Sequence, residues 1–426
     1  MPHTDAMEAY LHQVLHQIRW KRARQVIGRE LQNHLEDQYD ALLAAGLSPD
    51  QAEQETVCQM GDPVSVGQAL DKLHRPRLEW GLLWPLLLLL GCGWVIRPAL
   101  SGEQWLQALP GQLMPLAIGL ILGILLYFWN DKLLYEKPVQ LAYMMALVPF
   151  FAGRFYSSAF DLTFDQGLLL LPLAMGLMAY SMQGHGWRGI SAGLGLEFLL
   201  IVAGIQAKAF YFTCFLALYS LALLLYQAIK DPIGRNRCVG MGLVLAFHAA
   251  AVAVIWMLRD ALTRFLPANG AEFGATSLPW RVFWGSGWFS VGTVQLQKSE
   301  IQTLQNHFGL TWIVHQYGLV VALVLIGLLL ALFVQGFRIF RRQSSSFGRY
   351  CSLAILSTLA FESLGYLLQC MIGLPSAHFF LPLVDSSGPA LTLVLALLGL
   401  LLGMFRQNTI LDPYQLHHWF LGEAVC

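Results

Sequence analysis

Residues 319–342 read LVVALVLIGLLLALFVQGFRIFRR. The run from Leu319 to Phe337 holds no charge, and three arginines follow it, the first of them Arg338. A helix needs about 20 apolar residues to cross the hydrocarbon core of a bilayer. Cations at one end of such a run favour the cytoplasmic side of the membrane. The stretch therefore predicts a membrane-spanning helix whose C-terminal end is cytoplasmic.

The alternation of apolar runs and basic gaps continues through most of the chain. After about residue 80, ten runs are long enough to span a bilayer, with centres near Leu90, Leu120, Leu147, Met175, Leu199, Leu218, Val252, Val324, Leu359 and Leu397. Cations gather in alternate gaps, at Lys132 and Lys137, Arg188, Lys230 to Arg237, and Arg338 to Arg349. By the positive-inside rule these gaps are cytoplasmic, and the one long gap, 267–310, faces outward. The pattern predicts an all-α, polytopic membrane protein with about ten transmembrane helices.

Composition supports this class and excludes others. Of 426 residues, 56% are hydrophobic and 12% charged, which excludes an ordinary soluble or disordered protein. The formal net charge is zero, so no global field attracts nucleic acid. Seven cysteines are scattered without the spacing of a metal site. The first apolar run starts near Leu82, behind a polar head, so we expect no signal peptide.

The polar head, residues 1–78, predicts a small cytoplasmic helical domain. Apolar residues recur at helical spacing from Tyr10 to Ile18, and a second helix is expected from Arg22 to Ala45, ended by Gly46. Ser48 and Pro49 form a cap and a first helical residue, a punctuation that residues 60–63 (MGDP) repeat. We expect a transmembrane domain over 79–410 and a cytoplasmic tail over 411–426.

Ionisable residues in or beside the spans are candidates for function, because they are costly in a bilayer. Arg154 and Lys208 lie at outer ends of spans, where snorkelling is the alternative explanation. Glu197 and Glu362 lie within spans, where a hydrogen bond between helices is the alternative. Small residues would let helices approach closely, at Gly193, Gly195 and Gly204 and at Gly240 and Gly242.

The outer loop carries the richest set of polar and aromatic residues. It holds Arg281, Lys298, Glu300 and His307, and its tryptophans Trp280, Trp284 and Trp288 recur every fourth residue. That spacing would place three indoles on one interfacial helical face if the segment is helical. A basic, aromatic surface suits a ligand with an anionic head and an apolar tail, and an amphipathic cap over the bundle is the alternative. A second outer segment gathers Asp385, Ser386 and Ser387. Motifs of nucleotide hydrolysis and zinc proteolysis are absent.

Two segments of the C-terminal third resemble the SEDS family of cell-wall proteins (FtsW, RodA and SpoVE). Residues 305–319, QNHFGLTWIVHQYGL, are similar to the family's HTDFIFAxxxEELGL. Residues 372–375, IGLP, with 381–388, LPLVDSSG, are similar to its GxPLPFISYGGS turn. Residues 183–189, QGHGWRG, resemble an inner turn of SEDS variants, and the head is similar to the HAAS domain found ahead of some membrane proteins.

The resemblance implies a glycosyltransferase of the bacterial cytoplasmic membrane. SEDS proteins polymerise lipid II, an undecaprenyl-pyrophosphate disaccharide-pentapeptide, beside a class B penicillin-binding protein, in division, elongation or sporulation. The family's essential aspartate falls on His307, preceded by Asn306. The resemblance then implies His307, Glu300 and Asp385 as catalytic candidates. Substrate would be held by a basic and hydroxyl set of Arg154, Lys208, Arg281, Lys298, Ser386 and Ser387.

Three functions remain open on the sequence. Polymerisation needs a base for the acceptor hydroxyl and cations for the departing pyrophosphate. A divalent cation is compatible with that chemistry, although carboxylates are few on the outer face, and no other cofactor is expected. Because the aspartate is missing, a relative that binds lipid II or a partner synthase without catalysis is the first alternative. A transporter of lipid-linked precursors is the second.

Overall fold

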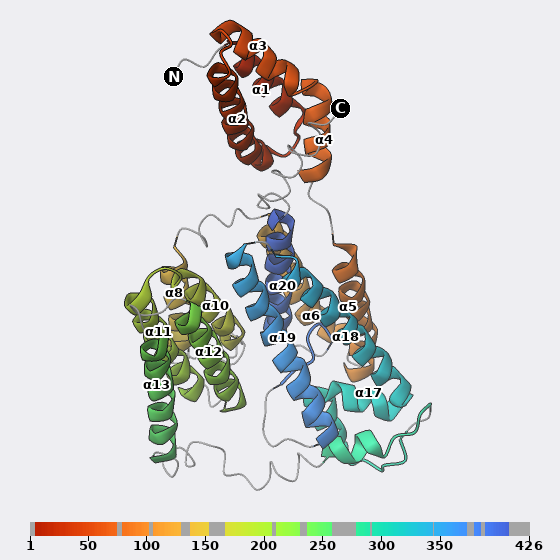
Figure 1. Ribbon diagram of the computed structural model, residues 1–426. Coiled ribbons are helices and arrows are strands. Elements are labelled where there is room, and N and C mark those ends of the chain that lie inside the picture. Colours follow the sequence, from red (N-terminus) through yellow and green to blue (C-terminus); the bar gives the residue numbers. More distant parts are fainter. Residues whose placement is uncertain are drawn as a thin grey trace. The chain divides into compact units, whose positions relative to one another are not determined.

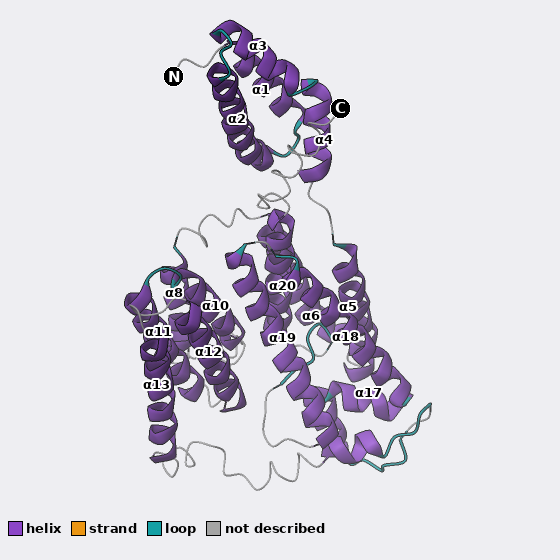
Figure 2. Cartoon of the chain, viewed as in Figure 1, coloured by secondary structure: helices purple, strands orange, loops and turns teal. Residues whose placement is uncertain are grey.

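The computed structural model describes residues 5–74, 79–101, 105–128, 137–152, 167–206, 210–230, 237–257, 278–289, 292–343, 345–372, 379–384 and 388–408. Throughout these residues the regular elements are helices (Figure 2). They divide into two compact units, with boundaries between Leu78 and Glu79 and between Met404 and Phe405.

The N-terminal unit contains four helices whose ends follow the local sequence. They are α1 (Asp5–Gln17), α2 (Lys21–Ala44), α3 (Pro49–Gln59) and α4 (Pro63–His74). Ser48 caps α3 as predicted, because its hydroxyl accepts from Gln51 N at 3.4 Å and Gln51 Oε1 accepts from Ser48 N at 3.3 Å. Asp62 accepts from Ser65 N at 2.8 Å and starts α4 in the same way.

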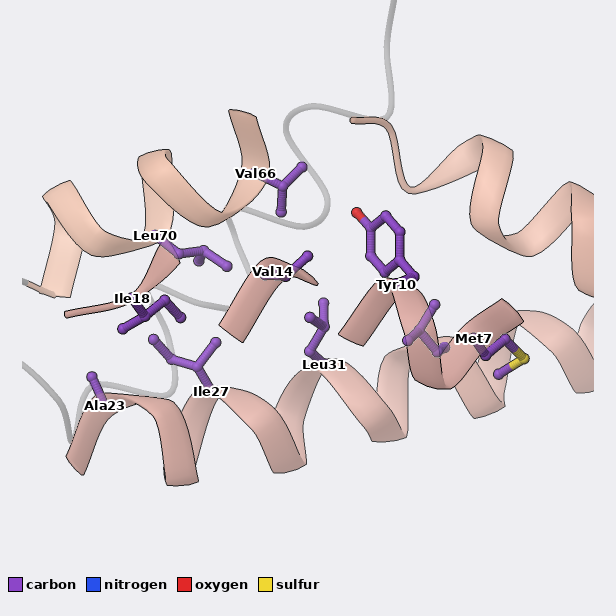
Figure 3. Close-up of a cluster of buried hydrophobic side chains, with 10 residues drawn as sticks. Met7, Tyr10, Val14, Ile18, Ala23, Ile27, Leu31, Val66 and Leu70 are labelled. Carbon is purple, nitrogen blue, oxygen red and sulfur yellow. The ribbon is translucent and has the colours of Figure 1, made fainter. Parts of the chain in front are cut away.

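The apolar spacing seen in the sequence builds the core of this unit (Figure 3). Val14 of α1 and Ile18, the residue directly after α1, are fully buried with Leu31 and Ile27 of α2 and Leu70 of α4. Tyr10 contributes its ring to this core and donates its hydroxyl to Met60 O at 2.9 Å. The four helices thus enclose one continuous apolar cluster.

The second unit consists mainly of apolar helices. In chain order they are α5 (Trp80–Ser101), α6 (Trp105–Phe128), α8 (Pro138–Ala152), α10 (Leu171–Ser181, preceded by the 3-10 turn Leu168–Leu170), α11 (Gly186–Gln206), α12 (Phe210–Lys230), α13 (Arg237–Met257), α18 (Leu319–Arg341), α19 (Ser346–Ile372) and α20 (Gly388–Asn408). Five helices, α11, α12, α18, α19 and α20, are long and apolar enough over their described residues to cross a membrane. The described parts of the other five are shorter apolar helices.

Each of the ten centres predicted from the sequence falls inside one of these ten helices. The prediction of a polytopic all-α membrane protein is therefore confirmed. α10 connects the helices around it, because it packs against α8, α11, α12 and α19 (Figure 1). Its residues from Leu171 to Ala179 are all buried. A Cβ on Gly176 would lie 3.0 Å from Tyr350 O, so the missing side chain allows the close contact with α19.

Glycines also set the crossing of α6 and α20. A Cβ on Gly399 would meet the carbonyl oxygen of Gly123 and lie 2.5 Å from its Cα. A Cβ on Gly403 would lie 2.9 Å from Leu126 O. The Thr392 hydroxyl donates to Pro115 O at 2.9 Å across the same pair of helices. Backbones this close are typical of small-residue interfaces in membranes.

The predicted close approaches are confirmed in part. A Cβ on Gly193 would lie 2.7 Å from Leu224 Cδ2, and one on Gly204 would lie 3.1 Å from Thr213 Cβ, so both glycines admit α12. A Cβ on Gly195 would meet the Tyr143 hydroxyl at 3.2 Å. The prediction for Gly242 is wrong, because nothing in the described part of the chain lies within 4 Å of its Cβ position. Gly242 lies on an exposed part of α13.

Candidate functional site

The long loop expected over 267–310 contains helices in its described part. A short helix over 278–284 is followed by a turn over 285–289 and an extended stretch over 292–297. Helix α16 (Lys298–His307) comes next, and helix α17 (Gly309–Tyr317) leads into α18. The segment 305–319, which carries the first family resemblance, therefore runs from the end of α16 through α17 to the start of α18.

Glu300 fixes the start of α16. Its Oε2 accepts from the backbone N of Gln297 at 2.9 Å and completes a capping box. Its Oε1 lies 3.3 Å from Nη2 of Arg281 and joins α16 to the 278–284 helix. Side chains at this contact remain partly exposed, 50% for Arg281 and 30% for Glu300, so the pair is a weak stabilising contact. Both carboxylate oxygens of Glu300 are thus already engaged.

Helix α17 is short and largely buried. Its residues from Gly309 to His315 are all buried, and it packs against α5, α16 and α18 (Figure 1). Leu310 N donates to the hydroxyl of Tyr366 on α19 at 3.1 Å, which fixes the first turn of α17. His315 O accepts from Gly292 N at 2.7 Å, which fixes the last turn against the extended stretch.

Gly318 makes the joint between α17 and α18. Its φ of 89° lies in the left-handed region that favours glycine, and a Cβ there would lie 2.7 Å from the Trp288 carbonyl carbon. The two residues after it donate to the same stretch, Leu319 N to Gly287 O at 3.0 Å and Val320 N to Trp288 O at 3.2 Å. This glycine occupies the position of the glycine in the family's EELGL, so the structure gives that match a steric reason.

The second family-like segment is described over 379–384 and also packs on α5. Leu381, Leu383 and Val384 are buried. A Cβ on Gly93 of α5 would lie 2.6 Å from Leu383 O. Leu383 has a φ of 70°, an unusual conformation for a bulky residue that costs about 1–3 kcal/mol and is often found at functional sites. Both family-like segments therefore rest on the same helix, α5.

Three of the nine predicted site residues have described side chains. Arg281 and Glu300 are brought together, and Lys298 is exposed at the first position of α16. His307 is the last residue of α16, seven residues after Glu300, so the helical path assumed between them is correct. Its side chain, like that of Asn306, lies outside the description. The remaining five residues lie outside the described residues, namely Arg154, Lys208, Asp385, Ser386 and Ser387.

The three tryptophans do not share one helix. Trp280 and Trp284 lie on the 278–284 helix, but the helix ends there and Trp288 follows the turn. The side chains are exposed, at 47%, 55% and 63% respectively. The indole nitrogen of Trp284 donates to Met371 O at 3.0 Å, near the end of α19. The prediction of a single helical face is therefore wrong at Trp288.

Two polar residues that the sequence did not single out lie on one face of α17. Thr311 and His315 are four residues apart and buried. Thr311 Oγ1 and His315 Nδ1 have no hydrogen-bond partner within the described residues. Burial lowers the pKa of His315, so its imidazole is neutral at physiological pH. The signal was the i, i+4 spacing of two polar residues that flank the apolar run from Trp312 to Val314.

Of the two buried glutamates, Glu197 is bonded between helices, as the alternative explanation predicted. The hydroxyl of Ser220 on α12 donates to its Oε1 at 2.7 Å. Glu362 is buried on α19, four residues before Tyr366. Within the described ranges, no group of three or more His, Cys, Asp or Glu side chains gathers as a metal site would require.

Comparisons with known proteins identify solved structures that share this architecture. No protein-family model matches the sequence, and no curated protein matches it. Solved structures do. A chain from a peptidoglycan synthase complex, described for the coordination of polymerization and crosslinking, matches with a TM-score of 0.61 and 17% identity, covering 78% of this chain and 98% of that one. The rod-shape-determining protein RodA of Thermus thermophilus matches with a TM-score of 0.54 and 18% identity, covering 78% and 97%; a point mutant of that RodA matches equally well.

The fold defines a multi-pass, all-α membrane protein. Its architecture is that of RodA, over nearly the full length of the RodA chain. The RodA-like fold expected from residues 305–319 and from residues 372–375 with 381–388 is therefore confirmed.

Proposed function

We propose that this protein is a SEDS-family peptidoglycan glycosyltransferase. It polymerises lipid II at the outer face of the bacterial cytoplasmic membrane, with its N-terminal unit and C-terminal tail in the cytoplasm. The observation that carries the proposal is that both family-like segments contact α5. The first does so through α16 and α17, and the second through Leu383. That convergence occurs in a fold shared with RodA.

The reaction that we propose transfers a glycan from one lipid carrier to a new acceptor. The acceptor sugar hydroxyl attacks the anomeric carbon of the donor, a glycosidic bond forms, and the bond from that carbon to the pyrophosphate oxygen breaks. A base takes the hydroxyl proton, and cations stabilise the departing undecaprenyl pyrophosphate. Each turnover therefore needs one proton acceptor and a cationic surface.

His307 is the first choice for the base, because it occupies the position of the family's aspartate and a neutral imidazole accepts protons at physiological pH. Glu300 is second, because taking a proton would disturb its cap or its ion pair with Arg281. Asp385 is third. The pyrophosphate would be bound by Arg281 and Lys298 together with Arg154, Lys208, Ser386 and Ser387.

A relative that binds lipid II or a partner synthase without catalysis is the second candidate. The lack of an aspartate at His307 and the engagement of both Glu300 oxygens favour it. The partner in either case is a class B penicillin-binding protein, which the similarity to a chain of a synthase complex supports. Transport of the precursor ranks below both, because it needs a polar path that reaches both faces of the membrane.

The test is polymerisation of labelled lipid II by the purified full chain, with and without a class B penicillin-binding protein. His307→Ala should lower turnover by about 10²–10⁴, the usual contribution of a positioned base. His307→Asp should retain or raise it. His185→Ala is the matched control, because His185 is an exposed histidine in the turn before α11.

Three outcomes distinguish the catalytic function from the non-catalytic one. Wild-type polymer that depends on His307 but not on His185 supports the proposal. Polymer from the wild type that survives both His307→Ala and Glu300→Gln refutes the base assignment and leaves Asp385. No polymer from the wild type with any partner, together with retained lipid II binding, supports the non-catalytic relative.

A further inference from the structure

A buried polar cluster lies far along the chain from the candidate site. Glu197 of α11, Ser220 of α12 and His248 of α13 meet inside the bundle. His248 Nε2 lies 2.6 Å from Glu197 Oε1, and the Ser220 hydroxyl donates to the same oxygen at 2.7 Å. The side chain of Glu197 is 1% exposed and that of His248 is 12% exposed.

Each of the three residues lies at the middle of a membrane-spanning helix. α11, α12 and α13 have 21 residues each, and Glu197, Ser220 and His248 are at or next to the central position of their helices. The cluster is therefore at the depth of the bilayer where an unpaired charge is most costly. Ionisable residues at that depth are functional candidates by default.

In the described parts of the surrounding helices, no other charged residue lies close enough to compensate Glu197. Over their described lengths α8 and α10 carry no charged residue, and the only charge of α12 is Lys230, ten residues from Ser220 or about 15 Å along the helix. Arg188 and Arg237, at the starts of α11 and α13, are similarly far.

The uncharged titratable groups around the cluster are engaged elsewhere or weakly acidic. On α8, the Tyr143 hydroxyl donates to Ala192 O at 3.1 Å. On α12, Tyr219 is a phenol, which carries no charge at physiological pH. The others in these helices are phenols and thiols, namely Tyr180, Tyr211, Cys214, Tyr226 and Cys238. His248 is therefore the one described group that can balance the glutamate charge.

The tautomer of His248 follows from its other nitrogen. Nδ1 lies 2.9 Å from Val244 O, and a carbonyl oxygen only accepts, so Nδ1 carries a proton. A neutral ring then turns the lone pair of Nε2 toward Glu197. A lone pair and a carboxylate oxygen 2.6 Å apart would repel. One further proton must belong to the pair, either on Glu197 or on His248.

We propose that Glu197, Ser220 and His248 form a proton-binding site at the membrane midplane, and that the bound proton holds α13 against α11 and α12. The apolar interface of α13 is small. Among its described residues only Gly240 and Val244 are buried, and Met241, Leu243 and Phe247 are half-buried. His248 continues the i, i+4 row of Gly240 and Val244. The polar contact therefore carries much of the attachment of α13, the helix that precedes the outer loop. Loss of the proton leaves a net negative charge at the midplane and releases the helix.

The test uses the accessibility of the buried face of α13. Val244→Cys is introduced into a full-length chain whose native cysteines are replaced, and its alkylation by N-ethylmaleimide is timed in liposomes from about pH 7 to about pH 9.5. The same cysteine with Glu197→Gln is the control. Its amide can donate to neutral His248 at every pH, and the intrinsic titration of the thiol cancels in the ratio of the two rates.

The labelling rate of Val244→Cys alone, divided by the rate of Val244→Cys with Glu197→Gln, should be near one at neutral pH. It should rise about tenfold at alkaline pH, as expected for loss of one bonded pair. His248→Leu should label about tenfold faster than the parent at neutral pH. A ratio that stays constant with pH overturns the proposal.

A second measurement needs no cysteine. The melting temperature of the wild type in detergent should fall relative to that of Glu197→Gln as the pH rises, and a constant difference refutes the site. If Val244→Cys does not fold, this comparison decides alone.

Discussion

Gly399→Ala should loosen the crossing of α6 and α20. The added methyl would meet the carbonyl oxygen of Gly123 and lie 2.5 Å from its Cα, whereas ordinary contact begins near 3.4 Å. Backbone atoms cannot rotate away as a side chain can. The two helices must therefore separate by roughly 1 Å to admit the methyl, the kind of shift that overpacking forces.

A separation of that size weakens every contact along the crossing. A gap of about 0.5–1 Å forfeits roughly a quarter to a half of the dispersion energy of each atom pair. The Thr392 to Pro115 hydrogen bond of 2.9 Å would lengthen as well. Overpacking costs typically about 1–3 kcal/mol, and contact with backbone places Gly399→Ala toward the upper end. The same substitution gains about 1 kcal/mol of helix propensity where space allows.

Gly242→Ala is the matched control, because none of the residues that the structure describes lies within 4 Å of its Cβ position on α13. It should be neutral or stabilising. Thermal unfolding of both variants in detergent measures the difference, which should be at least a few degrees in favour of the control. A melting temperature of Gly399→Ala equal to or above that of Gly242→Ala would refute the close crossing.

Three further outcomes are expected. Arg281→Glu should weaken lipid II binding at least tenfold, or about 1.4 kcal/mol, and adding Glu300→Arg should restore the ion pair; full recovery of binding in the double variant would mean that Arg281 acts only through structure. Burial, with Asp62 nearby, raises the pKa of Tyr10 to about 12 from 10. Residues 1–78 alone should therefore be most stable below about pH 10 and lose roughly 2–3 kcal/mol of unfolding free energy as the pH rises through about 12. Circular dichroism should show this loss, and Tyr10→Phe should abolish it. Cysteines at 269 and 345 should react from opposite sides with an impermeant maleimide, outside and inside respectively, and the reverse pattern would invert the topology.

The ten-helix architecture could be predicted because bilayer thickness and charge asymmetry act on each helix separately. The uncharged run ending at Arg338 is decisive on its own. The structure of the outer loop was harder to predict. The helix that carries Trp280 and Trp284 ends before Gly285, and the glycines at 285 and 287 were the available signal against a continuous face through Trp288.

The partners of buried polar groups could not be predicted from a single sequence. Glu197 stood out because a carboxylate within a span is rare. His248 lies on the second helix after it, and nothing local to either residue indicates that α11 and α13 face each other at that depth. For Thr311 and His315 the i, i+4 spacing was a signal, but it could be used only once α17 was recognised as a helix separate from α18.

The position of α5 beneath both family-like segments has a consequence for biosynthesis. This helix leaves the ribosome before every other apolar helix, whereas α17 and the turn at Leu383 are made near the end of the chain. Nine residues are too few to be inserted as a span, so α17 can settle only after α18 is in the membrane beside α5. The surface around Gly93 must stay uncovered until then. Substitutions in α5 that impair folding would therefore leave the other helices inserted in the membrane. The step that fails would be the last one, the packing of the outer loop.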